Sequence, residues 1–472
     1  MRSDGGSSSD SETMKGFAMN SHLLFKPLRR AIRCACMSLA IGSFSLLPVA
    51  SLETSHASDT SQTVSMVVQS GAAAKYWPHW RGPSIQGIVE GRGYPDRWSE
   101  TENVLWKVSV PGRGHSSPIV WGDRIFLTTA AADGSRRSLL SFRRSDGKLL
   151  WDLAVPPSPA ERLIPKNSYA SSSPTTDGNL VYGYFGNSGV VAVNFDGKLV
   201  WHISLGEINL YHGPGGSPLL YKDRLILFQD QMNFGRDRGV EPPPGFIVAL
   251  DKKTGRELWR KSRKPRPGWG SPIAVQVGNH VEIVVSSGRS IDAYDPDTGE
   301  VLWTVKGNMP ETIPMPVVGN GLLYCSSGRA GPTFAVRPGG KGDVTTSHVV
   351  WTSPKGSPFV PSPLLKGDYL YTINDMVSIA SCHNARTGEI VGQLRLGEAR
   401  RESFSASPVV VEGKIYFTND DGETFVLSAA PDFKLLHINR IGAPTLASPA
   451  LVDGRWSFRT ASHLVCVGKI DR

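Results

Sequence analysis

The feature that most constrains this chain is a serine–proline dipeptide that recurs along most of its 472 residues. Each copy leads into a short apolar run, and successive prolines lie 41 to 56 residues apart. A period of this length, with several short strands in each unit, is typical of a β-propeller or a related array. The copies are Ser117-Pro118, Ser173-Pro174, Ser217-Pro218, Ser271-Pro272, Ser362-Pro363, Ser407-Pro408 and Ser448-Pro449, with a degraded copy at Met315-Pro316.

One unit, residues 174–203, shows how each repeat is organised. The turn dipeptide Asp177-Gly178 separates its first two short runs, a second break precedes VVAVNF, and Asp196-Gly197 precedes KLVWHI. Four short strands joined by tight turns form one antiparallel blade of a propeller. A tryptophan recurs in the final strand of five units, at Trp151, Trp201, Trp259, Trp303 and Trp351.

A sixth tryptophan, Trp106, predicts how the ring closes. It lies in NVLWKVSV (103–110), which has the pattern of a final strand but precedes the first serine–proline copy. The last unit stops after its third strand, HLVCVG (463–468). We therefore expect residues 102–110 to pair with residues 463–469 and complete the last blade, which removes two open sheet edges. The fold predicted is an all-β, eight-bladed propeller of four-stranded antiparallel blades.

Several local motifs resemble those of the quinoprotein-like (PQQ-repeat) β-propeller family, where PQQ is pyrroloquinoline quinone. They are TGEVLW (298–303), DGKLVW (196–201), NVLWKV (103–108) and WPHWRGP (77–83), and the resemblance covers residues 76–472. The family includes quinone-dependent alcohol and sugar dehydrogenases, and also cofactor-free scaffolds such as the lipoprotein of outer-membrane barrel assembly. The resemblance implies that the six tryptophans dock between blades. It also makes PQQ and calcium the cofactors of an enzyme of this type.

The N-terminal residues predict export. A basic segment precedes 17 apolar residues, 34–50, which are followed by a plausible cleavage site at Ser55-His56-Ala57. This order is that of a secretory signal peptide, with an uncleaved anchor as the alternative. We expect a signal peptide within residues 1–57, whose polar beginning is consistent with an over-long start. A disordered linker over 58–75 and the propeller over 76–472 would follow, in the periplasm or outside the cell. The basic residues are Lys26, Arg29, Arg30 and Arg33.

Strand direction places the uniform turns on one face of the propeller and the variable loops on the other. The long connections are residues 154–172, 204–216 and 396–406, with an insertion at 229–245. Binding residues concentrate on variable loops held by a rigid scaffold. We expect a ligand-binding funnel mouth on this loop face, although each residue has a purely structural alternative. Its predicted residues are Arg113, His115, Lys166, Tyr169, Tyr211, His212, Trp269, Arg401 and Phe404.

The densest basic segment is WRKSRKPRPGWG (259–270), in a chain whose formal net charge is +9. Its prolines disfavour regular structure, so Lys261, Arg263, Lys264 and Arg266 are predicted to lie on an exposed loop. The loop is either a solvated charged surface or a contact for an acidic glycan, lipid head group or acidic protein.

These observations favour a binding or assembly scaffold that acts through the loop face. The first alternative is a PQQ- and calcium-dependent oxidoreductase, and the second is a propeller that binds or cleaves polyanionic glycans. We expect a monomer with a protein or anionic-glycan partner, no nucleic-acid partner, no metal site and no transmembrane helix in the mature chain. The catalytic residues of an enzyme are not identified. The resemblance leaves these loop-face residues as candidate calcium ligands: Asp230, Asn374, Asp375, Asn419, Asp420 and Asp421.

Overall fold

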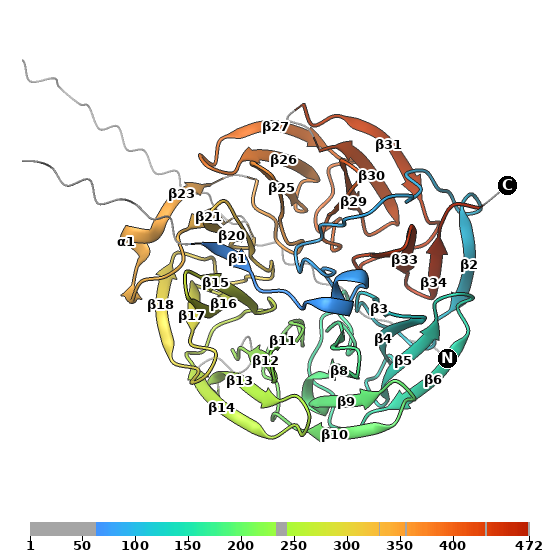
Figure 1. The fold of residues 1–472 in the computed structure, drawn as a ribbon, viewed down its shortest axis with the longest axis horizontal. Helices are drawn as coiled ribbons and strands as arrows, with labels where there is room; N and C mark the ends of the chain where they lie inside the picture. The colour runs from blue at the N-terminus through green and yellow to red at the C-terminus, as the bar shows by residue number, and fades with distance from the viewer. Residues whose placement is uncertain (1–62, 233–242, 330, 355, 430–431, 471–472) are drawn as a thin grey trace, which may run out of the picture. The chain divides into compact units, whose positions relative to one another are not determined.

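The computed structural model describes residues 63–470, apart from 233–242, 330, 355 and 430–431. These residues form eight antiparallel sheets arranged as blades around a central axis (Figure 1). Helix is limited to three short segments, η1 (Gly71–Lys75), η2 (Gly186–Ser188) and α1 (Thr345–His348), within this part of the chain. The predicted all-β, eight-bladed propeller is confirmed.

The first four blades follow the chain in order, as the colours of Figure 1 show. Blade 1 contains β3 (Ile119–Trp121), β4 (Arg124–Ala130), β5 (Arg137–Arg143) and β6 (Leu149–Ala154). Blade 2 contains β7 (Thr175–Thr176), β8 (Leu180–Tyr184), β9 (Val190–Asn194) and β10 (Leu199–Ile203). Blade 3 contains β11 (Leu219–Tyr221), β12 (Arg224–Gln229), β13 (Gly245–Asp251) and β14 (Glu257–Arg263). Blade 4 contains β15 (Ile273–Val277), β16 (His280–Ser287), β17 (Ser290–Tyr294) and β18 (Val301–Lys306).

The remaining blades complete the ring. Blade 5 contains β19 (Val317–Gly319), β20 (Leu322–Ser326), β21 (Thr333–Val336) and β23 (Val349–Ser353). Blade 6 contains β24 (Leu364–Lys366), β25 (Tyr369–Asn374), β26 (Ile379–Asn384) and β27 (Ile390–Arg395). Blade 7 contains β28 (Val409–Val411), β29 (Lys414–Thr418), β30 (Glu423–Ser428) and β31 (Leu435–Arg440). Blade 8 contains β32 (Ala450–Val452), β33 (Arg455–Arg459), β34 (His463–Val467) and β2 (Val104–Ser109).

Blade 8 joins the two ends of the propeller. Strand β2 runs antiparallel to β34, with Val104 opposite Val467 and Ser109 opposite His463. The N–H of Gly468 donates to the carbonyl of Asn103 at 2.9 Å, which extends the pairing by one residue. The predicted closure between residues 102–110 and 463–469 is therefore confirmed. It gives blade 8 its fourth strand, so that no blade of the described ring lacks an outer strand.

Residues 64–75 differ from the sequence prediction. Strand β1 (Val64–Met66) pairs with β15 in blade 4, with Val64 opposite Val277. Helix η1 follows it directly. The predicted disordered linker over 58–75 is thus replaced by ordered structure in its described part, because β1 covers an otherwise open strand edge in blade 4. Residues 58–62 and the predicted signal peptide lie outside the described residues. A second added strand, β22 (Gly342–Asp343), pairs with β18 of the same blade.

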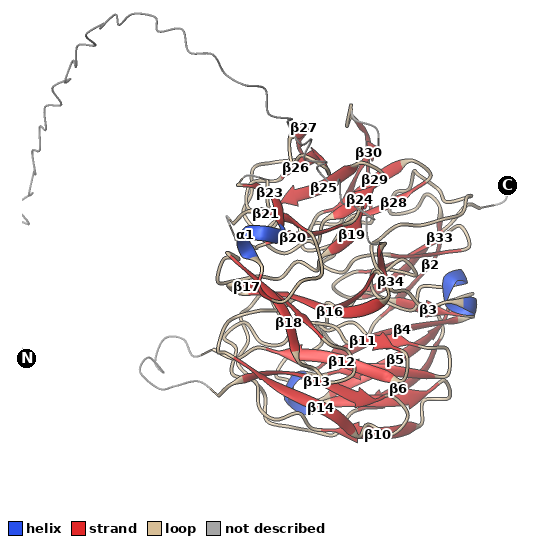
Figure 2. Ribbon diagram, turned by 60° about the vertical axis from the view of Figure 1, so that its left-hand side comes forward, coloured by secondary structure: helices blue, strands red, loops and turns tan. Residues whose placement is uncertain are grey.

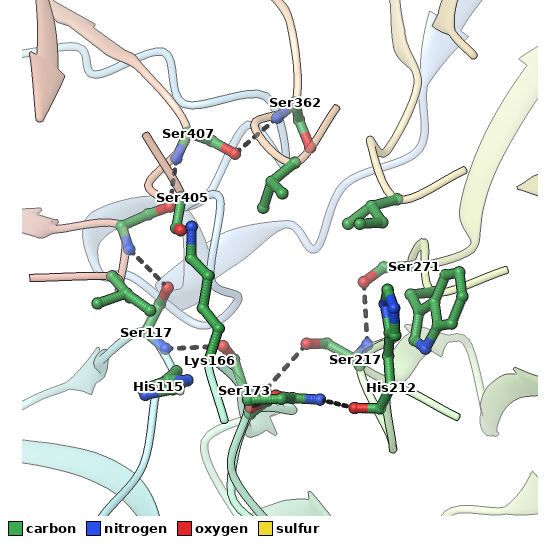
Figure 3. A pocket seen from close by; sticks show the side chains of 18 of the residues that line it. His115, Ser117, Lys166, Ser173, His212, Ser217, Ser271, Ser362, Ser405 and Ser407 are labelled. Atoms are coloured by element: carbon green, nitrogen blue, oxygen red, sulfur yellow. Dashed lines mark hydrogen bonds between the residues drawn. The ribbon is translucent and has the colours of Figure 1, made fainter. Parts of the chain in front are cut away.

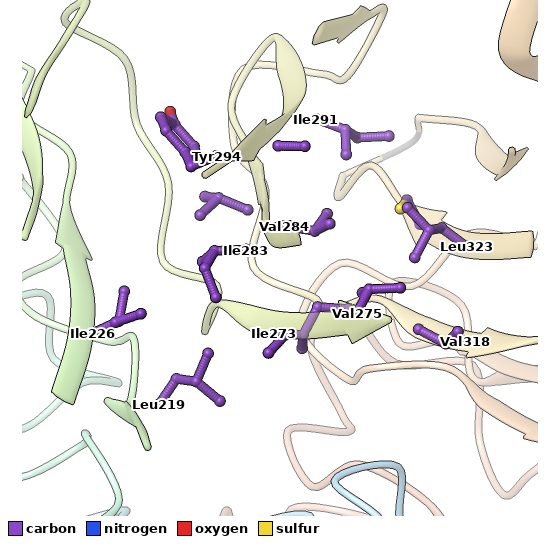
Figure 4. Packing of buried hydrophobic residues seen from close by; sticks show 14 of the residues in the cluster. Leu219, Ile226, Ile273, Val275, Ile283, Val284, Ile291, Tyr294, Val318 and Leu323 are labelled. Carbon is purple, nitrogen blue, oxygen red and sulfur yellow. The ribbon is translucent and has the colours of Figure 1, made fainter. Parts of the chain in front are cut away.

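The core lies between adjacent blades. Apolar side chains of neighbouring sheets interlock, as for Ile226 of blade 3, Ile283 of blade 4 and Leu323 of blade 5 (Figure 4). These three side chains have no solvent-exposed surface. Face-to-face packing of this kind holds each sheet at a fixed angle to the next and so fixes where the loops emerge. No helix in the described part of the chain is long and apolar enough to cross a bilayer.

Five of the six blade tryptophans fasten one blade to the next. The indole N–H of Trp201 donates to the carbonyl of Lys252 at 3.0 Å, in the last turn of blade 3. Its ring lies over Gly255, whose φ is +74° and where an added Cβ would lie 2.7 Å from the ring. Glycine is therefore required in this turn for both conformation and space. The same pairing joins Trp106 to Gly147, Trp151 to Gly197, Trp259 to Gly299 and Trp351 to Gly388.

Trp303 is the exception among the six. The unit that follows it, blade 5, has the sequence GGKGD (339–343) in place of a TG or DG turn. Trp303 is fully buried and donates its indole N–H to the carboxylate of Glu282 at 2.8 Å. All six tryptophans therefore pack in the body of the propeller, as the resemblance implied.

Candidate functional site

A cavity of about 350 Å³ opens on the loop face around the propeller axis. Figure 3 shows its wall, with His115 and Lys166 on one side and His212 on another. The lining combines two cations, Lys166 and Arg329, with an aromatic wall and an apolar set. The aromatic residues are Trp80, Trp269 and Phe359, and the apolar set is Ile164, Ile313, Val360 and Leu446.

The serines of the repeated dipeptide form a hydrogen-bonded ring, here called the serine belt. The backbone N–H of Ser117 donates to the hydroxyl of Ser173 at 2.8 Å. Ser173 bonds in the same way to Ser217 at 3.0 Å. With one break after Ser271, the pattern continues to Ser448, which bonds back to Ser117 at 3.0 Å. The belt members are Ser117, Ser173, Ser217, Ser271, Ser362, Ser407 and Ser448, and all line the cavity (Figure 3).

The belt has one irregular position. Met315 stands where blade 5 would carry a serine, and it donates its N–H to the hydroxyl of Ser362 at 2.9 Å. It offers no hydroxyl to Ser271 of the preceding blade. The dipeptide was interpreted from the sequence only as the start of each innermost strand. Its second role is to link neighbouring blades at the level of the cavity.

A non-repeating segment, residues 77–88, packs against the inner strands and is here called the axial plug. Trp77 exchanges two backbone hydrogen bonds with Val120 of β3, at 2.8 and 2.9 Å. The carbonyl of Pro78 accepts from Thr176 of β7 at 3.0 Å, and the side-chain oxygen of Gln86 accepts from Val318 of β19 at 2.6 Å. The plug thus contacts blades on several sides of the axis.

Arg81 lies at the centre of the axial plug and is fully buried. Its guanidinium donates to the carbonyls of Pro408 at 2.7 Å, Pro363 at 2.9 Å and Gln86 at 2.6 Å. Pro363 and Pro408 directly follow two serines of the belt. The motif WPHWRGP, which the resemblance grouped with the blade pattern, is therefore the plug, and its Trp80 contributes to the cavity lining.

The structure brings together part of the predicted funnel mouth. His115, Lys166, His212 and Trp269 all line the axial cavity. The rings of His212 and Trp269 stack with centroids 5.0 Å apart and an interplanar angle of 25°. Tyr211 meets the edge of Trp269 at 6.0 Å and hydrogen-bonds to Glu311.

Other predicted residues lie elsewhere. Arg113 and Tyr169 line a neighbouring cavity of about 220 Å³. Arg401 is exposed and does not line the axial cavity. Phe404 is only 1% exposed and packs against Phe425 in the core between blades 6 and 7, so its placement at the mouth was wrong. An apolar ring that can enter a core does so in preference to facing water.

The loops around the mouth are tied to one another. Lys166 forms an ion pair with Asp420 at 2.9 Å and donates to the carbonyl of Glu402 at 2.6 Å. Arg329 lies 3.3 Å from the Glu402 carboxylate and 3.4 Å from that of Glu311. These contacts join loops from opposite sides of the mouth. Sequence reasoning missed Arg329 and Glu402, because neither occupies a repeated position.

Burial sets the charge of the cavity wall. It lowers the pKa of His115 to about 3, with help from the charge of Arg459. Burial likewise lowers the pKa of His212 to about 4, assisted by the charge of Arg329. Both imidazoles are therefore neutral at pH 7. The charged side chains of the described lining are Lys166, Arg329 and Glu402. Lys166 is paired with Asp420, and Arg329 with Glu402 and Glu311.

Asp375 lies directly behind the cavity wall and supports a pH prediction. One oxygen accepts the N–H of Phe359 at 2.7 Å, and the other has no partner among the described residues. Burial raises the pKa of this carboxyl from 3.8 to about 7. A raised pKa means that the folded protein binds the proton more tightly than the unfolded chain. The contribution to stability is therefore complete below about pH 4 and is lost as the pH rises towards 7.

We expect Asp375→Asn to preserve the accepted hydrogen bond without the ionisable group. Urea unfolding should show similar stability of the two proteins near pH 4, an advantage of the variant that grows between pH 4 and 7, and a constant advantage above pH 7. Parallel stability curves for the two proteins between pH 4 and 7 would show that Asp375 does not titrate there.

The candidate calcium ligands do not assemble into a metal site. Calcium takes six to eight oxygen ligands, with carboxylates prominent among them. Asp230 pairs with Arg263 and Asp420 pairs with Lys166, so both carboxylates are already matched to cations. Across the described ranges, no three acidic, histidine or cysteine side chains are placed to hold one ion. Glu402 is the single carboxylate in the described lining, and its partner is Arg329. The donor set therefore does not fit calcium.

The basic segment does not form the predicted exposed loop. Strand β14 continues to Arg263, whose guanidinium is buried and pairs with Asp230 at 2.7 Å. Arg266 is also largely covered and pairs with Asp292 at 3.1 Å. Lys261 pairs with Glu300, and Lys264 is exposed. The four charges are separated because Arg263 and Arg266 turn inward to Asp230 and Asp292, whereas Lys264 stays exposed and Lys261 pairs with Glu300.

Known proteins with similar sequences indicate the family to which this chain belongs. A family model described as outer membrane protein assembly factor BamB matches residues 97–210 and 244–467. Tetrathionate hydrolase of Acidithiobacillus ferrooxidans is 22% identical over 399 residues, which span 66% of this chain and 74% of the hydrolase. Polyvinylalcohol dehydrogenase of a Sphingopyxis species is 22% identical over 275 residues. That match spans 50% of this chain but only 40% of the dehydrogenase.

Solved structures show the same fold at low sequence identity. BamB from Moraxella catarrhalis superposes with a TM-score of 0.54 at 15% identity, covering 78% of this chain and 98% of that one. Quinohemoprotein alcohol dehydrogenase from Comamonas testosteroni gives 0.58 at 13% identity, covering 85% and 82%. At these identities the likeness concerns the fold alone.

Proposed function

Since this chain belongs to the family of outer membrane protein assembly factor BamB, we propose that it is a binding scaffold whose loop face recognises its ligand through the axial cavity. The ligand has an apolar or flat body and carries negative charge. The observation that carries the proposal is the cavity itself, with Lys166 and Arg329 beside the stacked rings of His212 and Trp269.

The arrangement of the mouth supports recognition by a preformed site. Lys166 and Arg329 each contact residues from other blades, so the loops that carry them are held before any ligand arrives. A site that is already ordered loses less conformational entropy on binding and therefore binds more tightly. One relative, tetrathionate hydrolase, acts by its name on a sulfur oxyanion, which is consistent with an anionic ligand here.

The quinone-dependent oxidoreductase is the second candidate. Its support is the flat wall formed by Trp269 and His212 beside two cations, which would suit a flat polyanionic cofactor such as PQQ. The carboxylates, however, do not supply a calcium site. For this reason the scaffold is preferred, and no reaction step is derived through the quinone.

Two further predictions from the sequence concern a glycan ligand and export. The polyanionic-glycan function was predicted from a basic, aromatic mouth with the basic segment nearby. Its support is weaker because Arg263 of that segment is buried and paired with Asp230. Export stays part of the proposal, carried by the basic and apolar residues 26–57 and consistent with the envelope protein whose family model matches.

A fluorescent probe tests the proposal. Anilinonaphthalene sulfonate has a flat apolar body and one negative charge, and it should bind the purified protein at one site. Leu446→Trp places a bulky ring in the cavity and should abolish this binding, whereas Val301→Trp, on an exposed outer-strand position, should not alter it. Unchanged binding by Leu446→Trp would contradict the cavity as the site. Sustained alcohol oxidation after addition of PQQ and calcium would favour the oxidoreductase instead.

A further inference from the structure

The serine belt has unused hydrogen-bond donors. Each belt hydroxyl accepts one backbone N–H from its neighbour, as Ser217 does from Ser173 at 3.0 Å and Ser271 from Ser217 at 2.9 Å. A serine hydroxyl also carries one proton to donate. In the described part of the protein, none of the seven protons has an acceptor, and all seven serines line the axial cavity. Figure 3 shows the belt bordering the open centre of the cavity.

Two buried cations next to the belt have no carboxylate partner. Arg81 donates only to carbonyls, including those of Pro363 and Pro408, and its Nε has no hydrogen-bond partner among the described residues. Burial lowers its pKa to about 9, so it remains charged at pH 7. A buried charge without a counter-charge is costly, and proteins normally pair it.

Arg459 is a second buried guanidinium without a carboxylate partner, on another side of the belt. It is buried, and it donates to the hydroxyl of Ser116 and the carbonyl of Thr128, both at 2.6 Å. Burial lowers its pKa to about 9 as well, and its charge acts on His115 in the cavity wall. The described residues supply no anion to balance either guanidinium.

From these two observations we propose that the belt is the floor of an oxyanion site, at which free serine hydroxyls hold a sulfonate, sulfate, phosphate or carboxylate group. Hydroxyl donors bind the oxygens, and Arg81 and Arg459 supply the positive potential. The body of an organic anion lies against Ile164, Ile313 and Leu446 above it. This inference rests on the proposed function and identifies the charged end of its ligand.

A matched pair of probes tests the inference. Anilinonaphthalene sulfonate and the neutral phenylnaphthylamine share one ring system and differ by the sulfonate. The sulfonate should bind at least about tenfold more tightly, because hydrogen bonds to charged groups are worth more than neutral ones. Inorganic sulfate at constant ionic strength should displace it if a free oxyanion fills the site. Failure of sulfate to compete, with the tenfold preference intact, would identify an organic anion as the ligand.

Single substitutions locate the site. Ser217→Ala and Ser271→Ala should each remove most of the preference for the sulfonate, and Ser271→Thr, which keeps a hydroxyl, should retain it. Ser171→Ala is the control, since Ser171 also lines the cavity but already donates its proton to Asn167. Thermal unfolding of each variant establishes that it is folded. Equal binding of the two probes, or a preference indifferent to the belt substitutions, would overturn the oxyanion site. The proposed function would survive that result as long as Leu446→Trp still blocks the probe.

Discussion

Removal of residues 76–110 should convert the protein into insoluble material. The deletion takes away β2, so β34 loses its partner and blade 8 is left with three strands and an open edge. It also removes Arg81 and Trp77 of the axial plug, whose contacts reach several blades. Unpaired edges and exposed apolar surface both lead to aggregation.

The measurement is the soluble fraction after expression, followed by gel filtration and thermal unfolding. A chain that begins at Thr63 is the control, because it retains β1, the plug and β2, and it should be soluble and unfold cooperatively. A soluble monomer with unchanged melting after deletion of 76–110 would contradict the closure.

Arg263→Ser should destabilise the protein by about 3–5 kcal/mol, the usual cost of breaking a buried ion pair by removing one partner. The guanidinium of Arg263 is buried with Asp230 at 2.7 Å, and Asp292 lies 3.5 Å away. Removing it leaves buried carboxylates without their cation.

Lys264→Ser is the matched control for this change. Lys264 is the next residue in the chain and is exposed, so its loss should alter stability by less than about 0.5 kcal/mol. Urea unfolding of the three proteins measures both effects. Similar stabilities of Arg263→Ser and Lys264→Ser would show that the buried ion pair does not stabilise the fold.

The architecture was predictable because it is repetitive. The serine–proline period located the blades, and Trp106 outside its expected unit indicated that β2 would close the ring. The tryptophan and glycine positions of adjacent units also specify the contact that joins them, as Trp201 and Gly255 show. Local patterns carry such features, since each depends on residues at fixed positions within one unit.

The site was less predictable because it depends on contacts between residues that lie far apart in the sequence. Arg263 and Lys264 are adjacent basic residues that the sequence does not distinguish. Arg263 is buried because it pairs with Asp230, which follows β12. Arg329 and Glu402 meet across the mouth from separate blades. Trp269 and His212 were found from the sequence because they lie a few residues upstream of the repeated dipeptide, whereas Phe404, also a few residues upstream, turns into the core.

The positions of the axial plug and the hydrogen bonds of the serine belt were also not predictable from the repeat. WPHWRGP has no counterpart elsewhere in the chain, so repetition gives no indication of where it packs. The serines are visible in the sequence, but the bond from the N–H of one to the hydroxyl of the next exists only once the ring is closed. The sequence therefore predicted the scaffold in detail and the chemistry of its centre in part.

The most direct test of the central claim, that the axial cavity carries a ligand, is native mass spectrometry of the protein purified from its own cells. We predict one bound small molecule of negative charge on the parent protein and on Val301→Trp, and none on Leu446→Trp. An identical bound mass on all three proteins would contradict the claim. So would a parent protein that carries no ligand before or after incubation with the sulfonate probe.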